Sequence, residues 1–223
     1  MKRIIIGAFI CLLSQYGFSQ STEIDSIRNI AISYYQNNDL INAKVQFEKI
    51  SEIDSSNVDA LFNLGIINSQ QNNNKRAILY FQKCVVLRDR QSAKILKDNY
   101  KVRIAYSDFM HFEDVDVLPK YIYKKDTLNF INGINLNDKF LKSINKKLKK
   151  SDVIKKFKKK QRIFVRLETD KNGRIVCRII KGSGIVEIDD EIQSIFENSN
   201  NIIPGKYEGK NVGVWSWVLP ITI

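Results

Sequence analysis

Residue types that carry catalytic chemistry are scarce in this sequence. His111 is the single histidine among 223 residues, and only three cysteines occur. No HExxH, CxxC, P-loop or GxGxxG motif is present. Acidic residues around the histidine could hold a cation loosely, but we favour a solvated loop there; they are Asp108, Glu113, Asp114 and Asp116. We therefore predict that the protein is not an enzyme and has no metal or cofactor.

The first nineteen residues have the layout of a secretory signal peptide. A positive pair precedes an apolar stretch at 4–13, and small residues after it allow cleavage before Gln20. We favour export with cleavage of 1–19; the alternative is an uncleaved anchor that keeps residues 4–18 in the bilayer. The mature chain then retains Cys84 and Cys177, and we expect each of them to be a small buried hydrophobe.

Positive charge is the dominant feature of the composition. Lys and Arg number 36 against 24 acids, which gives a formal net charge of +12. Twelve of these cations fall between Lys139 and Arg162, where apolar residues recur at helical spacing, so we expect an amphipathic helix with a lysine-rich wet face. Because the chain is exported, we expect no nucleic-acid partner. Four lysines form a candidate electrostatic patch for peripheral contact with lipid headgroups or for an acidic protein: Lys146, Lys147, Lys149 and Lys150.

A repeat with an offset of 34 residues organises the first half of the chain. Within each unit, 24–57 and 58–91, apolar residues are three or four apart, and a polar stretch divides the unit into two helices. The small and large positions match between the units: Ala43 with Ala77, and Phe47 with Phe81. This pattern resembles the tetratricopeptide repeat (TPR), whose small–x₃–large motif is intact in both copies. A further amphipathic stretch at about 91–106 is expected to cap the stack.

The tetratricopeptide resemblance implies a function for one surface of the repeats. In that family the first helix of each repeat lines a concave groove that holds a peptide. This groove either binds an extended or helical partner segment or packs on the next domain. The groove positions carried over to this sequence are Asp25, Arg28, Ile32, Tyr35, Asp59, Phe62 and Ile66.

The last quarter of the chain is rich in strand signals. Residues 161–180 contain two alternating apolar runs joined by an Asp-Lys-Asn-Gly turn, which is a strong hairpin signal. A short helix is expected from Asp189, and a last strand over 212–219. The order of hairpin, helix and strand predicts an α+β domain with a small antiparallel sheet that a helix covers on one face.

The motifs of the C-terminal half resemble, in their order, the C-terminal domain of TonB in the form common among Bacteroidetes-type proteins. They are VDVLPKY, the Lys-rich helix, QRIFVRLETDKNGRIV, the acidic helix start, and IPGK followed by a strand ending in LPI. The resemblance implies a periplasmic protein whose exposed sheet edge pairs with an extended segment of an outer-membrane transporter. The two tryptophans of the last strand are either an exposed hot spot or core under the helix. The candidate edge is 211–218, with the site residues Val212, Val214, Trp215 and Trp217.

These signals predict a multi-domain protein with N-terminal all-α helical repeats over 20–106, a linker over 107–135 and a TonB-like α+β domain over 136–223. Three functions compete. The first is a periplasmic adaptor that binds an envelope protein by strand addition and a second partner through the repeats. The second is an energy transducer for outer-membrane import, anchored in the inner membrane and facing the periplasm. The third is electrostatic docking at the envelope surface; an open sheet edge also allows a homodimer.

Overall fold

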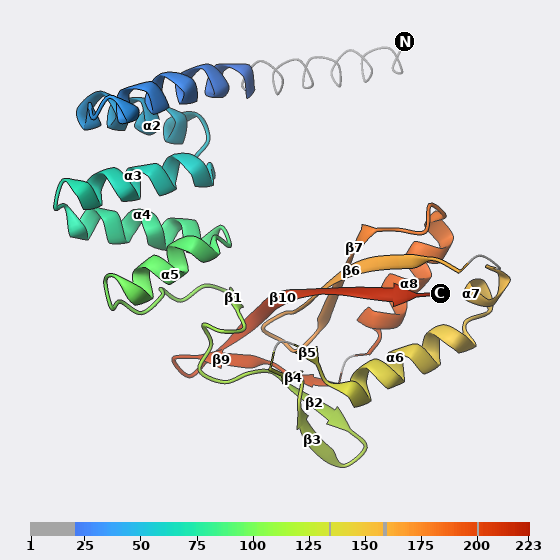
Figure 1. Ribbon diagram of the computed structural model, residues 1–223. Helices are drawn as coiled ribbons and strands as arrows, with labels where there is room; N and C mark the ends of the chain where they lie inside the picture. The colour runs from blue at the N-terminus through green and yellow to red at the C-terminus, as the bar shows by residue number, and fades with distance from the viewer. Residues whose placement is uncertain (1–20, 134, 158–159, 200) are drawn as a thin grey trace, which may run out of the picture. The chain divides into compact units, whose positions relative to one another are not determined.

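The computed structural model describes residues 21–133, 135–157, 160–199 and 201–223. The chain divides into two compact units between Ala105 and Tyr106, one helical and one that combines small sheets with helices (Figure 1). This confirms the predicted order of a helical repeat region followed by a region with small antiparallel sheets. The predicted signal peptide, 1–19, lies outside the described residues.

The helical unit is a stack of helices joined by short polar turns. A helix over 21–36 comes first. Asp39, Asn57 and Asp89 each begin a later helix, because their side chains accept a hydrogen bond from the backbone N–H three residues on. Asp39 lies in the polar stretch that divides the first repeat, so this stretch caps a helix as well as breaking one; Asn73, in the second stretch, makes no such side-chain bond. The later helices are α2 (Leu40–Ile53), α3 (Val58–Gln70), α4 (Asn74–Val86) and α5 (Arg90–Asp98).

Small residues let the paired helices approach each other closely. Ala43 and Ala77 are fully buried, and Phe47 and Phe81 fill the space beside them, as the repeat pattern predicted. Gly65 marks a close approach, because a Cβ atom there would lie 2.7 Å from a ring carbon of Phe81. Phe81 of α4 thus packs directly on the backbone of α3.

The last helix of the stack is shorter than predicted. α5 has nine residues, whereas the sequence indicated a capping helix over about 91–106. Lys101 adopts a left-handed conformation with φ of 54°, which takes the chain out of the helix. Gln82 of α4 then holds the extended chain, accepting from the Ala105 N–H (2.7 Å) and donating to the Arg103 carbonyl (2.8 Å). The short helix α5 and the extended chain after Lys101 together cover this end of the stack.

The second unit has three helices and ten strands in its described residues, and most of the strands are short. Its first strands are β1 (Phe109–His111), β2 (Lys120–Tyr123), β3 (Asp126–Asn129), β4 (Ile131–Asn132) and β5 (Asn135–Leu136). Its helices are α6 (Asp138–Lys150), α7 (Asp152–Lys156) and α8 (Val186–Glu197). Its later strands are β6 (Arg162–Thr169), β7 (Ile175–Lys181), β8 (Ile202–Ile203), β9 (Gly205–Tyr207) and β10 (Lys210–Thr222).

One sheet forms the frame of this unit, with the strand order β1–β10–β6–β7. β6 and β7 are the predicted hairpin, and β10 lies antiparallel to β6. β9 pairs with the start of β10, while β3, β2 and β8 form a separate small sheet. Helices cover one face of the main sheet: ring contacts run from Phe196 of α8 through Phe140 of α6 and Phe130 to Trp217 of β10.

The predicted linker over 107–135 is wrong, because this segment is folded. It carries β1 to β4, and β1 adds in parallel to β10 with Met110 opposite Val214. Tyr121 and Phe130 are buried core residues. These strands are only two to four residues long, which is too short for an alternating pattern to register. Moreover, β1 and β2 find partners close to the C-terminus of the chain.

The helices of the second unit follow their predicted patterns with one shift. α6 is the predicted amphipathic helix, with apolar residues buried and lysines exposed. α8 begins at Val186, three residues before the predicted start at Asp189. The Asp189 carboxylate accepts the Ser183 N–H (2.8 Å), so it ties down the chain that precedes the helix from a position within the first turn.

Asn68 of α3 is a local conflict in the repeat core. Its side chain is fully buried and donates to the Leu64 carbonyl (2.7 Å), but its Oδ1 atom has no partner in the part of the chain that the structure describes. An unsatisfied buried acceptor is destabilising, so Asn68→Leu should raise the free energy of unfolding of the helical unit by about 1 kcal/mol. Urea unfolding followed by helical circular dichroism measures this change.

Asn63→Leu is the matched control on the same helix. Asn63 is half-buried, and its amide donates to the Asp59 carbonyl (2.8 Å). This replacement should give no stabilisation. Equal gains for the two variants, or a loss for Asn68→Leu, would contradict the identification of Asn68 as an unsatisfied core residue.

Candidate interaction surfaces

His111 is buried, which corrects the expectation of a solvated acidic loop. It stands in β1 with 8% of its surface exposed. Its ring packs against those of Phe112 and Trp215, with centroid separations of 4.5 and 4.9 Å. Asp114, in the turn after β1, is buried as well. Among the described residues, no three His, Cys, Asp or Glu side chains are grouped so as to hold a metal ion.

Cys84 and Cys177 are free, buried thiols, as predicted for small hydrophobes. Burial raises the pKa of the Cys84 thiol to about 11 and the pKa of the Cys177 thiol to about 12, because an apolar surrounding disfavours the thiolate. Both side chains are therefore protonated near neutral pH and poor nucleophiles.

The groove residues of the first repeat lie on the helix over 21–36. Asp25 and Arg28 form an ion pair with each other, in which Asp25 is exposed and Arg28 is half-buried. Ile32 is exposed. The Tyr35 hydroxyl accepts a hydrogen bond from the Gln70 side chain of α3 (2.8 Å). This bond joins the first helices of successive repeats, so these helices lie side by side as a groove requires.

The groove residues of the second repeat are divided between surface and core. Asp59 is exposed near the start of α3. Phe62 and Ile66 are half-buried and pack against the cluster around Phe81. The rings of Phe62 and Phe81 meet edge-on, with centroids 5.7 Å apart. Phe62 and Ile66 therefore stabilise the repeat and leave only part of their surface for a partner.

β10 does not have the free edge that was predicted over 211–218. Residues 210–212 pair with β9, and residues 213–215 pair with β1. The Gly213 N–H donates to the Asp108 carbonyl beside β1 (2.8 Å), while the Val214 N–H donates to the Thr169 hydroxyl of β6 (3.3 Å). The prediction is wrong for this part of the strand, because β9 pairs with its start and β1 pairs with the residues that follow.

A β-bulge decides where the two tryptophans point. The register shifts between Trp215 and Trp217, so the residue added between them interchanges the faces of the strand. Trp217 is buried, 3% exposed, on the helix-covered face with Val212 and Val214. Trp215 is half-buried on the opposite face against His111. Both interpretations of the pair, an exposed hot spot or a shared place in the core, are wrong because both assumed strict alternation.

The end of β10 has a strand neighbour on one side only. Residues 217–222 pair with β6, and no strand of the described residues lies on the other side of 216–222. Ile223 exchanges two hydrogen bonds with Gln161, each 3.2 Å long. In an antiparallel pair such exchanging residues alternate with residues whose backbone groups point away. We call the outward side of 216–222 the open flank.

Three residues contribute backbone groups to the open flank. The backbone groups of Ile223 point toward β6, so those of every second residue before it do so as well. The N–H and C=O groups of Val218 and Thr222 lie at the alternate positions and point outward. Pro220 lies between them, where its missing N–H would also point outward, so it removes no bond to β6. The predicted edge, 211–218, included Val218 but not Pro220 or Thr222. A proline inside a strand is typical of an edge and could have signalled this position.

The opposite edge of the main sheet is partly blocked. β7 is the outer strand there, and the Cys177 N–H donates to a carboxylate oxygen of Glu197 on α8 (3.2 Å). Because the Glu197 side chain already accepts from this edge N–H, an added strand would find fewer unpaired backbone groups on β7. The open flank of β10 is therefore the better candidate for strand addition.

The predicted electrostatic patch lies in the last turns of α6. All four of its lysines are exposed. Lys147, Lys149 and Lys150 stand in the last turn, where the helix dipole favours positive charge. An open pocket of about 420–520 Å³ lies on each side of this turn. One of them is lined almost entirely by lysines, namely Lys142, Lys146, Lys149 and Lys150 with Asn145.

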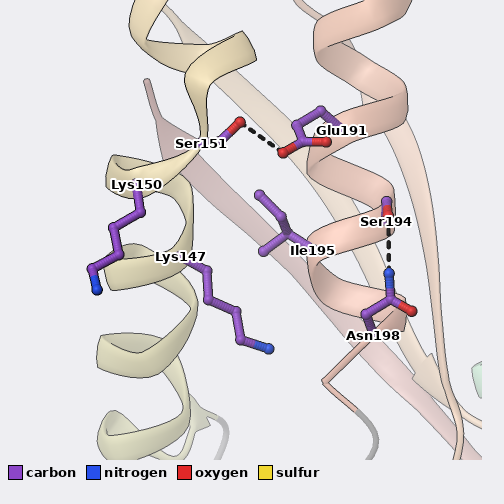
Figure 2. Close-up of a pocket in the computed structure, with 7 residues that line it drawn as sticks. All are labelled: Lys147, Lys150, Ser151, Glu191, Ser194, Ile195 and Asn198. Atoms are coloured by element: carbon purple, nitrogen blue, oxygen red, sulfur yellow. Dashed lines mark hydrogen bonds between the residues drawn. The ribbon is translucent and has the colours of Figure 1, made fainter.

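The other pocket lies between α6 and α8 (Figure 2). Its polar groups mostly bind one another: the Ser151 hydroxyl donates to a Glu191 carboxylate oxygen (2.6 Å). Lys147 donates to the Ser199 hydroxyl (2.7 Å), while Lys150 points away from α8. These hydrogen bonds connect α6 with α8 and its C-terminal end, and they leave few polar groups of the pocket available to a ligand.

Comparison with known proteins identifies part of the helical unit. No curated protein matches the chain. Separately, no helix in the described ranges is both long enough and apolar enough to cross a membrane. A family model described as "Tetratricopeptide repeat" matches residues 58–89, which comprise α3, α4 and the turn that follows. The match does not extend to 106–223, so the resemblance of that region to TonB stays a prediction. The chain therefore contains a tetratricopeptide repeat within a helical N-terminal region.

Proposed function

We propose that this protein is an exported adaptor that binds an extended segment of an envelope protein by strand addition to β10. The observation that carries the proposal is the open flank, where residues 216–222 have a neighbour on one side and Val218 is 48% exposed. An edge of this kind pairs readily with another extended chain, and main-chain hydrogen bonds supply the affinity. The TonB resemblance makes an outer-membrane transporter the partner that we expect.

The tetratricopeptide repeat indicates protein partners, and we place a second docking surface in the helical unit. The first helices of successive repeats are held together by the bond between Tyr35 and Gln70 and leave Ile32 and Asp59 exposed. Such a face suits a peptide with both apolar and basic side chains. Both surfaces are binding surfaces, and we propose no catalytic role.

Val218→Pro should abolish strand addition and leave the pairing of β10 with β6 intact. The N–H that proline removes points away from β6, so an added strand loses a donor while the sheet loses none. Affinity capture from the cell envelope with the full chain as bait, quantified by mass spectrometry, should show at least about a ten-fold lower recovery of the β10 partner.

Val218→Thr is the matched control, because threonine keeps the N–H and favours strands. It should recover the partner as the natural chain does, and partners held by the repeats should be recovered by both variants. Undiminished recovery of every partner on Val218→Pro would overturn the strand-addition proposal.

The compartment proposed for the adaptor has its own test. If 1–19 is a cleaved signal peptide, the mass of the mature protein should correspond to a chain that begins at Gln20. The alternative, an energy transducer anchored by residues 4–18, requires these residues to be retained. Intact mass spectrometry of the protein from its own cells distinguishes the two, and an uncleaved chain in the membrane fraction would favour the transducer.

Electrostatic docking through α6 is a second candidate. Its support is that lysines repeat at i, i+4 along the helix, as in Lys142, Lys146 and Lys150, where like charges destabilise a helix slightly. Changing Lys146, Lys147, Lys149 and Lys150 to Gln should weaken binding to anionic lipid vesicles about ten-fold at low salt. The control removes the same charge elsewhere, at Lys49, Lys75, Lys94 and Lys120, which are exposed. Unchanged vesicle binding by the α6 variant ends this candidate.

A further inference from the structure

The face of the main sheet that looks away from the helices is strongly basic. We call it the outer face; on β6 it alternates with the buried residues Val165 and Leu167. In one row across the sheet, Val218 of β10 lies opposite Arg166 of β6, which lies opposite Arg178 of β7. The next rows place Pro220, Phe164 and Lys181 side by side, and then Thr222 and Arg162. All four of these cations are exposed.

The pairing of Arg166 with Arg178 conflicts with the usual rules of sheet stability. Like charges directly opposite each other on neighbouring strands are destabilising. Neither guanidinium has a hydrogen bond or ion pair among the described residues. Glu168 is the one acidic residue of β6, β7 and β10, and it is only 2% exposed. A local conflict of this kind, left without compensation, often marks a binding site.

We propose that the outer face recognises acidic side chains on the segment that adds to β10; this inference rests on the strand addition proposed above. A residue of the added strand opposite Val218 would face outward, about 10 Å from the backbone of β6, since strands lie about 4.8 Å apart. Arginine and glutamate side chains together span that distance across the short side chain of Val218. Arg166 would therefore meet a carboxylate at this position, with the charge of Arg178 behind it.

The neighbouring rows extend the recognition pattern. An added residue opposite Pro220 would lie over Pro220 and beside Phe164, which favours an apolar side chain. An added residue opposite Thr222 would face Arg162 in the same way as the first faces Arg166. The partner segment should therefore carry an acid, an apolar residue and a second acid at alternate positions.

The open flank makes a polypeptide the expected occupant of this surface. Val218 and Thr222 offer N–H donors, and Val218, Pro220 and Thr222 offer carbonyl acceptors. A second strand supplies both complementary groups at the spacing of a sheet. The phosphate groups of a nucleic acid or a lipid offer acceptors only, so they would not satisfy the carbonyl groups beside the arginines.

Two blocked peptides test the inference on the full chain by fluorescence anisotropy. The acidic peptide is Thr-Glu-Thr-Val-Thr-Glu-Thr, and its matched counterpart carries Gln in place of both Glu. At about 50 mM salt, where screening is weak, the acidic peptide should bind about ten-fold more tightly. Arg166→Gln and Arg178→Gln should each weaken the acidic peptide several-fold and leave the Gln peptide unchanged.

Arg174→Gln is the matched control, since Arg174 is exposed in the turn between β6 and β7 and its loss removes the same charge. It should affect neither peptide. Thermal unfolding separates binding from folding: Arg178→Gln relieves a like-charge pair, so its melting temperature should stay equal or rise while its affinity falls.

The outcomes distinguish this inference from the proposed function. Equal affinity for the two peptides, or no effect of Arg166→Gln, overturns acidic recognition and leaves strand addition standing. Acidic binding that depends on Arg166 but survives Val218→Pro supports acidic recognition and overturns strand addition. A single-stranded oligonucleotide or anionic lipid vesicles that compete equally well through the same arginines would overturn the choice of a polypeptide. Failure of both peptides to bind at millimolar concentration would overturn the inference as well.

Discussion

The hydrogen bonding of one strand, β10, sets the architecture of the second unit. β10 has thirteen residues, and its backbone pairs with β9 and β1 at one end and with β6 along most of its length. Backbone groups in a folded protein need a partner or water. Beyond His111, where β1 ends, the outward groups of β10 have no strand to pair with in the described residues. The place of the open flank is therefore decided by the length of β1.

The β-bulge in β10 gives the two halves of the strand different roles. It turns Trp217 into the core, where its ring meets that of Phe130 at a centroid distance of 6.0 Å. The same shift brings Val218 and Pro220 onto the outer face, in register with Arg166 and Phe164. One irregularity thus completes the core and also places the open flank beside a basic surface. A strand with strict alternation would have exposed Trp217 and buried Val218.

The helical unit is stabilised by contacts that recur from one repeat to the next. The packing of Phe81 on Gly65 requires a residue without a Cβ atom at that position. Asn68 is an exception to this apolar packing, because it is fully buried and its Oδ1 atom lacks a partner among the described residues. The groove residues Phe62 and Ile66 also serve the core, so the repeat offers a partner mainly the side chains that its own packing does not use.

The sequence by itself determined the features that depend on neighbouring residues. The helix pairs follow from the apolar period and from caps such as Asn57, and the β6–β7 hairpin follows from its Asn-Gly turn. The burial of Phe47, Phe81 and Cys177 follows from the same patterns. Only the tertiary structure decided the parallel pairing of β1 with β10, the bulge beside Trp217 and hence the open flank around Val218. These features join residues about a hundred positions apart or break a regular alternation, and a pattern that spans a few residues carries no information on either.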